Sequence, residues 1–189
     1  LVVGSQKVVV RLVPSGILHP DCLCLIGSGV VVNPVALFEE ISELNKAGVP
    51  NVEERIKISA ASALLLPIHQ AIDKAAEKKR GSKAIGTTGR GIGPCYEDKV
   101  ARRGLRVGDL LYLDTFKEKL RTLLEYRNFL LSSYYHEPEI SFDSVLEQIL
   151  PVRERLLRMV ADVSSLLEQG RARQQKILFE GAQGTFLDI

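Results

Sequence analysis

The sequence predicts an α/β protein that contains part of a largely parallel sheet, flanking helices and an α-helical subdomain. Short runs of β-branched residues alternate with stretches in which apolar residues recur every three or four positions. Such alternation is typical of parallel sheets with connecting helices. A longer region of helical pattern, residues 114–169, predicts a helical insert. We therefore expect residues 1–189 to form the central part of a single domain.

The composition excludes several classes of protein. Of the 189 residues, 46% are hydrophobic and 25% are charged, and the net charge is only +2, so nucleic-acid binding through bulk electrostatics is not expected. The sequence shows no run near the roughly 20 apolar residues that a membrane-spanning helix needs. Three cysteines, an odd and sparse set, fit a reducing compartment and predict a cytoplasmic protein without a disulfide framework.

Five short segments are predicted as strands because they are rich in β-branched residues or alternate between apolar and polar positions. They are Lys7–Leu12, Cys22–Ile26, Gly29–Val32, Arg55–Ser59 and Lys176–Phe179.

Two helices are predicted between these strands. Asn33 and Pro34 suit the N-cap and the first position of a helix over 35–47, and Gly48 is placed to end it. A second helix is predicted over 67–80, where apolar residues lie on one side and basic residues gather at the C-terminal end.

From Asp114 onward the pattern is strongly helical. Thr115 and Glu118 have the spacing of a capping box at a helix start. A second long helix is predicted over Phe142–Gln169, and Pro151 should start or kink part of it.

The first segment that suggests chemistry is Gly86–Pro94, with four glycines in eight residues and two adjacent threonines. Glycines let the backbone approach a ligand, and exposed N–H groups and hydroxyls bind phosphate oxygens. Arg90 adds a permanent positive charge. A flexible surface loop is the plain alternative, and the Gly-Lys-[Ser/Thr] ending of a P-loop is missing. The Thr-Thr-Gly-Arg run favours anion binding.

A cluster of arginines follows the loop. Arg102, Arg103 and Arg106 lie within five residues and could neutralise a phosphate or a carboxylate. The alternative is a solvated helix face whose arginines pair with Glu97 and Asp98. RNA or nucleotide binding through the basic segment 99–106 is a weaker third possibility.

The third segment, 179–185, directly follows a predicted strand, where ligands often bind in open α/β sheets. Gln183 could present its amide to a base or to an attacking group, although a plain strand-to-loop turn is the simpler interpretation. His19, His69 and His136 are scattered without the spacing of a metal site or of a catalytic triad, and we expect structural roles for them.

The ends of the sequence also bear on its organisation. The chain begins inside an apolar run without an initiator Met and stops at Leu187-Asp188-Ile189. We therefore expect an internal fragment of a longer protein.

Two of these segments together resemble one known family. The string 84–106 is similar to a signature of the adenylosuccinate synthetases, and residues 179–189 resemble a second signature of that family. The resemblance covers essentially the whole chain in the right order. It implies an incomplete version of a synthetase fold that is similar to that of P-loop NTPases.

The resemblance also implies an activity and a set of site residues. Members of this family use GTP to phosphorylate the 6-oxygen of IMP, and aspartate then displaces the phosphate to give adenylosuccinate in AMP biosynthesis. Thr88 resembles the threonine that binds the IMP 5′-phosphate, and Arg102 resembles an arginine supplied across a homodimer to the IMP of the other subunit. Gln183 resembles a glutamine near the reacting 6-position of the base. Arg90 is expected to line the same pocket.

The partners implied by the resemblance are IMP, L-aspartate, GTP and Mg²⁺, with no nucleic acid and no membrane. The family's catalytic aspartate, which also binds Mg²⁺, and its catalytic histidine have no counterpart in the 189 residues. We therefore expect no metal ligand in this chain and no ligase activity from it alone. A non-catalytic remnant that dimerises or binds a nucleotide phosphate is the alternative.

Overall fold

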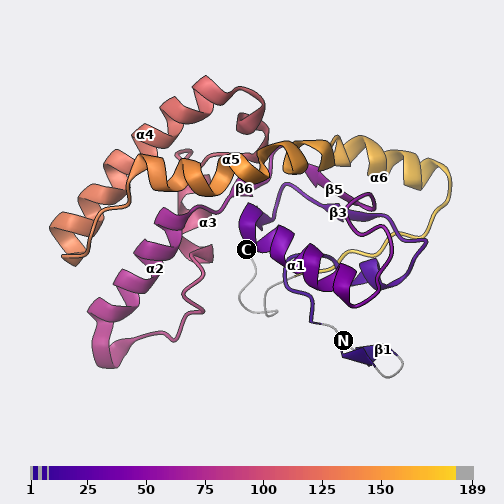
Figure 1. Ribbon diagram of the computed structural model, residues 1–189, viewed down its shortest axis with the longest axis horizontal. Helices are drawn as coiled ribbons and strands as arrows, with labels where there is room; N and C mark the ends of the chain where they lie inside the picture. Colours follow the sequence, from indigo (N-terminus) through magenta and orange to yellow (C-terminus); the bar gives the residue numbers. More distant parts are fainter. Residues whose placement is uncertain (1, 4–5, 8, 182–189) are drawn as a thin grey trace.

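The computed structural model describes residues 2–3, 6–7 and 9–181 (Figure 1). Within them, three short sheets are formed. The first has the strand order β3-β5-β7 and is parallel throughout. The second pairs β4 with β6 in parallel, and β1 and β2 form an antiparallel pair. The bounds are β1 Val2–Val3, β2 Gln6–Lys7, β3 Cys24–Ile26, β4 Val31–Val32, β5 Ile56–Ser59, β6 Ala63–Leu64 and β7 Val160–Ala161.

The predicted α/β class with a parallel sheet and flanking helices is confirmed. The α-helices are α1 Pro34–Lys46, α2 Pro67–Arg80, α3 Ile92–Val100, α4 Leu113–Phe129, α5 Phe142–Met159 and α6 Val163–Ala172. Short 3-10 helices are η1 Ser15–Leu18, η2 Gly81–Lys83 and η3 Val107–Leu111, and η4 Leu130–Tyr135 is a π-helix that continues α4.

The local signals set the ends of α1 and α2. The Asn33 side chain accepts a hydrogen bond from the backbone N–H of Ala36 at 3.1 Å, and Pro34 begins α1. Gly48 follows the helix with a φ of +84°, a conformation that suits glycine. The predicted helix over 67–80 agrees with α2.

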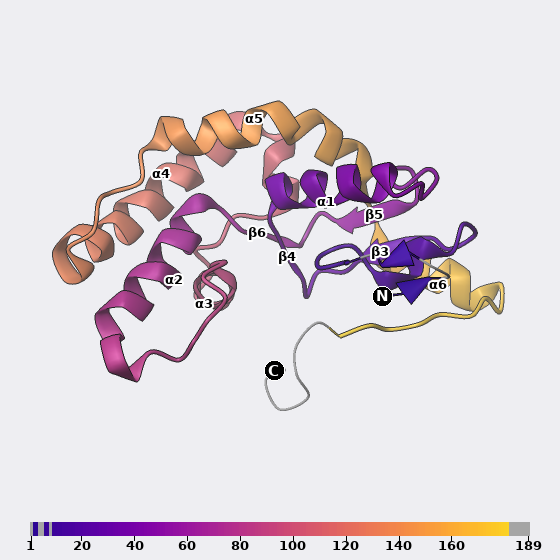
Figure 2. The same cartoon turned by 60° about the horizontal axis from the view of Figure 1, so that its bottom comes forward.

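Helix α5 joins the two sides of the molecule. Figures 1 and 2 show α2, α3 and α4 at one end, α1 with β3 and β5 at the other, β6 between them, and α5 running across. It packs against α1, α4 and β5. Ile149 and Leu156 on its inner face are buried in the same apolar cluster as Ile41 of α1 and Leu124 of α4. One continuous core therefore underlies both ends.

Several predicted elements are corrected by the structure. The strand predicted over Lys7–Leu12 does not form over residues 9–12, because the backbone N–H groups of Arg11, Leu12 and Val13 bond instead to the buried Glu40 carboxylate, at 2.6–3.3 Å. The predicted capping box at Thr115 is also wrong. Helix α4 begins at Leu113 with Tyr112 as its N-cap, and no side chain caps it.

The predicted long helix over Phe142–Gln169 is two helices. Pro151 lies inside α5, and the break comes later, where β7 leaves the helical path to pair with β5. No strand forms over Lys176–Phe179. The division of the chain into a core and a helical insert over 114–169 remains a prediction.

Candidate functional site

The glycine loop lies between α2 and α3. After η2 the chain turns back over residues 84–91 and enters α3 (Figure 2), and α3 packs against α2. Helix α3 begins at Ile92, so the last part of the predicted loop, Ile92–Pro94, is its first turn. The loop is therefore bounded by two helices that contact each other, which limits where its middle can lie.

Two carboxylates of α2 hold this loop. Asp73, which is 7% exposed, accepts hydrogen bonds from the Thr87 hydroxyl and from the Gly91 N–H, each at 2.9 Å. Glu77 accepts three backbone N–H groups, those of Ile85, Gly86 and Thr87, at 2.7–3.2 Å. These two residues, one helical turn apart on α2, were not predicted as part of the site. The available signal was their i, i+4 spacing just before a glycine-rich run.

The ionisation of Glu77 follows from these contacts. Its limited burial raises the pKa, but hydrogen bonds from Arg80 and from the loop backbone outweigh burial and lower the pKa to about 2. Glu77 is therefore a carboxylate at neutral pH, the form that accepts these hydrogen bonds.

Gly91 is required by both space and backbone conformation. Its φ is +82°, and a Cβ placed on it would lie 2.6 Å from the His69 carbonyl carbon and from the Gln70 nitrogen. Backbone atoms cannot move aside as a flexible side chain can. The loop therefore passes against the first turn of α2 at a point where only glycine fits.

The predicted ligands Thr88 and Arg90 lie in the middle of the loop and are exposed. Within the described residues, no group accepts a hydrogen bond from the side chain or the backbone N–H of either one. Thr87, by contrast, is held by Asp73. The structure thus separates the two adjacent threonines into one that fixes the loop and one that remains available to a ligand.

A buried charge network fixes α3 beneath the loop. Asp98 has no exposed surface and lies 2.9 Å and 2.8 Å from two nitrogens of Arg127 and 3.1 Å from Nε of Arg103. Burial raises the pKa of Asp98, but His69 and Arg127 outweigh it and bring the pKa down to about 2. This ion pair joins α3 to α4.

His69 completes the network from α2. Its Nδ1 accepts the backbone N–H of Leu66 at 2.9 Å, so the proton is on Nε2. Nε2 lies 3.3 Å from an Asp98 oxygen, close enough for attraction but without hydrogen-bond alignment. Burial is the main influence on His69 and lowers its pKa, so the imidazole is neutral and has a structural role here, as the sequence predicted.

Within the part of the chain that the structure describes, the arginine cluster, like the two threonines, contains both paired and unpaired side chains. Arg103 pairs with Asp98 and Glu97, as the helix-face alternative predicted. The side chains of Arg102 and Arg106 are exposed and have no hydrogen-bonding or ionic partner among the described residues. Arg102 has a φ of +61° just after α3. It is therefore free to contact a ligand or another molecule.

Gln183 lies outside the described residues. The segment that leads to it is anchored at Glu180, whose carboxylate accepts hydrogen bonds from the backbone N–H and the hydroxyl of Ser15 at 3.0 Å and 2.8 Å. Glu180 thus contacts the first residue of η1, which lies 165 positions away in sequence.

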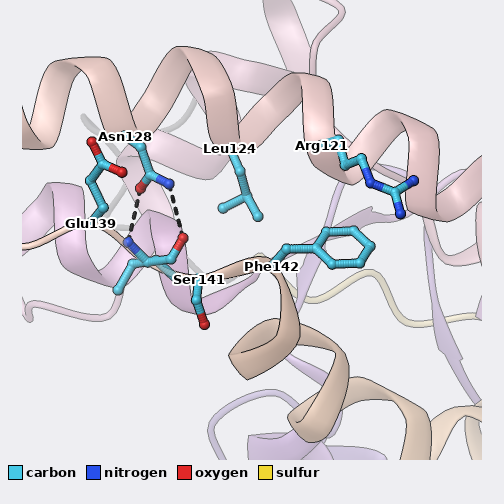
Figure 3. A pocket seen from close by; sticks show the side chains of 7 residues that line it. Arg121, Leu124, Asn128, Glu139, Ser141 and Phe142 are labelled. Atoms are coloured by element: carbon cyan, nitrogen blue, oxygen red, sulfur yellow. Dashed lines mark hydrogen bonds between the residues drawn. The ribbon is translucent and has the colours of Figure 1, made fainter.

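A cavity in the described part of the chain lies elsewhere. It has a volume of about 360 Å³ and lies between α4 and the segment that leads into α5 (Figure 3). The Asn128 amide bridges the backbone N–H and carbonyl of Ile140 there, and Arg121 stacks 4.4 Å from the centre of the Phe142 ring. None of the predicted site residues lines this cavity, so we do not assign it a ligand.

The described residues also bear on metals and membranes. They contain no group of three or more His, Cys, Asp or Glu residues that could hold a metal ion. No helix among them has the length and apolar character to cross a bilayer.

Comparisons with known proteins agree with the signatures. The family model described as adenylosuccinate synthetase matches residues 1–189. Adenylosuccinate synthetases of Polynucleobacter asymbioticus and Tolumonas auensis are 56% and 54% identical over the whole chain. The chain spans only 42% and 44% of those two relatives.

The fold agrees as well. The structure of a fully ligated adenylosuccinate synthetase from Plasmodium falciparum matches with a TM-score of 0.86 and 31% identity, over 98% of this chain and 42% of that one. A family match along the full 189 residues, supported by this structural similarity, shows that the chain belongs to the adenylosuccinate synthetase family.

Proposed function

We propose that this chain supplies the IMP-phosphate part of a ligase that uses GTP to join L-aspartate to IMP, forming adenylosuccinate in AMP biosynthesis. Family membership supports the reaction. The observation that carries the role of this chain is the glycine loop, which presents Thr88 and Arg90 to solvent between two points fixed by Asp73.

The proposed roles follow from chemistry. The Thr88 hydroxyl and backbone N–H donate to oxygens of the 5′-phosphate, and the Arg90 guanidinium neutralises its charge. Arg102, exposed beyond α3, reaches the IMP bound by a second copy in a cytoplasmic homodimer. Gln183 places its amide near the 6-position of the purine, where negative charge develops during phosphorylation.

The proposed reaction uses GTP and Mg²⁺, but we assign neither of them a binding site among the described residues. Those residues offer no carboxylate cluster for a hard cation, so no step is assigned to a metal here. We propose that the 189 residues alone do not catalyse the ligase reaction. GTP- and aspartate-dependent release of adenylosuccinate by this polypeptide, followed in a coupled assay, would refute that statement.

Binding of IMP to the chain tests the site. Calorimetric titration should show that Thr88→Ala and Arg90→Ala each weaken IMP binding by about tenfold, the effect expected when a charge-assisted hydrogen bond is lost. Thr115→Ala, at an exposed threonine on α4, is the matched control and should bind like the parent. Equal IMP affinity in Thr88→Ala and the parent would contradict the proposed phosphate site.

RNA binding is less well supported by the contacts. In the basic segment 99–106, Lys99 donates to the Ser28 carbonyl at 2.7 Å and Arg103 is paired with Asp98, so part of the positive charge is already used. An RNA affinity that falls steeply with salt would favour this alternative over IMP binding.

A further inference from the structure

The two α2 carboxylates suggest which loop groups a phosphate can use. We propose that Asp73 and Glu77 are positioning residues that occupy the inward donors of the glycine loop and leave residues 88–90 as the donors for the nucleotide phosphate. This inference rests on the proposed IMP-phosphate site and makes it more specific. It assigns no direct ligand contact to either carboxylate.

Asp73 closes the middle of the loop. One carboxylate oxygen holds the Thr87 hydroxyl and the other holds the Gly91 N–H. The residues between these points, Thr88 to Arg90, therefore span a short bridge with both ends fixed to α2. A loop ordered before binding loses less conformational entropy when it takes up its ligand.

Glu77 fills the first part of the loop. Successive N–H groups of Ile85, Gly86 and Thr87 converge on its carboxylate, an arrangement of backbone donors that commonly binds a phosphate. Here the chain's own anion takes that place, and the low pKa of Glu77 keeps it charged at neutral pH. A phosphate at the same point would meet both a lack of free donors and a like charge.

The donors that remain lie further along the loop. In the part of the chain that the structure describes, the N–H groups of Thr88 and Arg90 and both of their side chains have no acceptor. The N–H of Gly89 makes only a long contact of 3.4 Å to the Thr87 hydroxyl. Phosphate binding is thus shifted from the first glycine of the loop to the Thr88–Arg90 bridge.

Amide chemical shifts of the ¹⁵N-labelled chain, titrated with IMP and separately with inorganic phosphate, test this assignment. In the parent, the amides of residues 88–90 should shift and those of residues 85–87 should not. Glu77→Ala removes the internal anion, so phosphate should then also shift the amides of Gly86 and Thr87. A merely structural role for Glu77 would not create these new shifts.

Asp73 is tested by a pair of variants. Asp73→Ala should weaken IMP binding by about tenfold. Asp73→Asn should restore most of the affinity, because its amide can accept from Gly91 and donate to the Thr87 hydroxyl. If Asp73→Ala does not fold, Asp73→Asn and the amide pattern of Glu77→Ala still decide the question.

The outcomes separate the two proposals. If IMP shifts no amide of residues 88–90 in the folded parent, the proposed phosphate site fails and this inference fails with it. If IMP binds but shifts residues 85–87 as strongly as residues 88–90 in the parent, only the positioning role is overturned. Parent-like IMP affinity in a folded Asp73→Ala variant overturns it as well.

Discussion

Replacing Gly91 with alanine should destabilise the protein strongly, because the loop touches α2 at this residue. The added Cβ would lie 2.6 Å from backbone atoms of His69 and Gln70, at a φ of +82°. The left-handed conformation costs an L-residue roughly 1–2 kcal/mol, and relieving such overpacking costs about 1–3 kcal/mol. We expect the free energy of unfolding to fall by about 3 kcal/mol in total.

Gly93 provides the matched control two residues later. It lies in the first turn of α3, has no positive φ, and a Cβ there meets nothing within 4 Å. Gly93→Ala should therefore leave stability unchanged or raise it by a few tenths of a kcal/mol. Urea unfolding of both variants, with far-UV circular dichroism as the signal, makes the comparison. If Gly91→Ala and Gly93→Ala unfold at the same midpoint, the proposed close approach of loop and helix is wrong.

Further variants probe three buried polar side chains, those of Asp98, His69 and Glu40. Asp98→Ala should lower the free energy of unfolding by about 3 kcal/mol, the low end for a broken buried ion pair, because Arg127 keeps a second, exposed carboxylate; parent-like urea unfolding would argue against it. Burial lowers the pKa of His69 below 6.5, so on acidification the imidazole takes up a proton in the unfolded chain before it does so in the folded one. The free energy of unfolding should therefore fall as pH drops below about 6.5, and this dependence on pH should be weaker in His69→Gln. The same dependence in both proteins would show that another group is responsible. Glu40→Gln should lower the free energy of unfolding by about 2 kcal/mol, because the Glu40 carboxylate accepts backbone N–H groups inside the protein. Glu43→Gln, at an exposed ion pair, is the control and should lower it by less than about 1 kcal/mol. Equal losses of stability in the two variants would contradict this reasoning.

Helices whose ends carry local signals could be predicted from the sequence. Asn33 with Pro34 and then Gly48 bracket α1, and the helix predicted over 67–80 is α2. In each case the capping atom or the permissive backbone belongs to the same short segment. Distant residues were therefore not needed to set these boundaries.

Strands depended on distant partners and were less predictable. Residues 9–12 do not form a strand, because Glu40 of α1 accepts the backbone N–H groups of Arg11, Leu12 and Val13. Val160 and Ala161 looked like part of a helix but pair with β5. A two-residue strand has no periodicity of its own, so only the tertiary partner reveals it.

In the candidate site too, local features could be predicted from the sequence and contacts with distant residues could not. Thr88 and Arg90 could be selected because glycine, hydroxyl and guanidinium groups lie in one short run. The groups that hold this run come from α2, and α3 beneath it is fixed by the bond from Arg127 to Asp98, which joins residues 29 positions apart. Which of two adjacent threonines is free and which is held by Asp73 became clear only from the contacts.

The pairing of β5 with β7 has a consequence for how the chain is made. During synthesis, β5 emerges with β3 beside it, but its other neighbour appears only after the helical region has been translated. The nearby pair of Glu53 and Arg155 also joins residues that are 102 positions apart in sequence. Because closing so long an interval is slow relative to local helix formation, the open edge of β5 is exposed on the nascent chain until Val160 and Ala161 have been made and have paired with it. That edge is where we expect chaperone contact or premature association to occur on the ribosome.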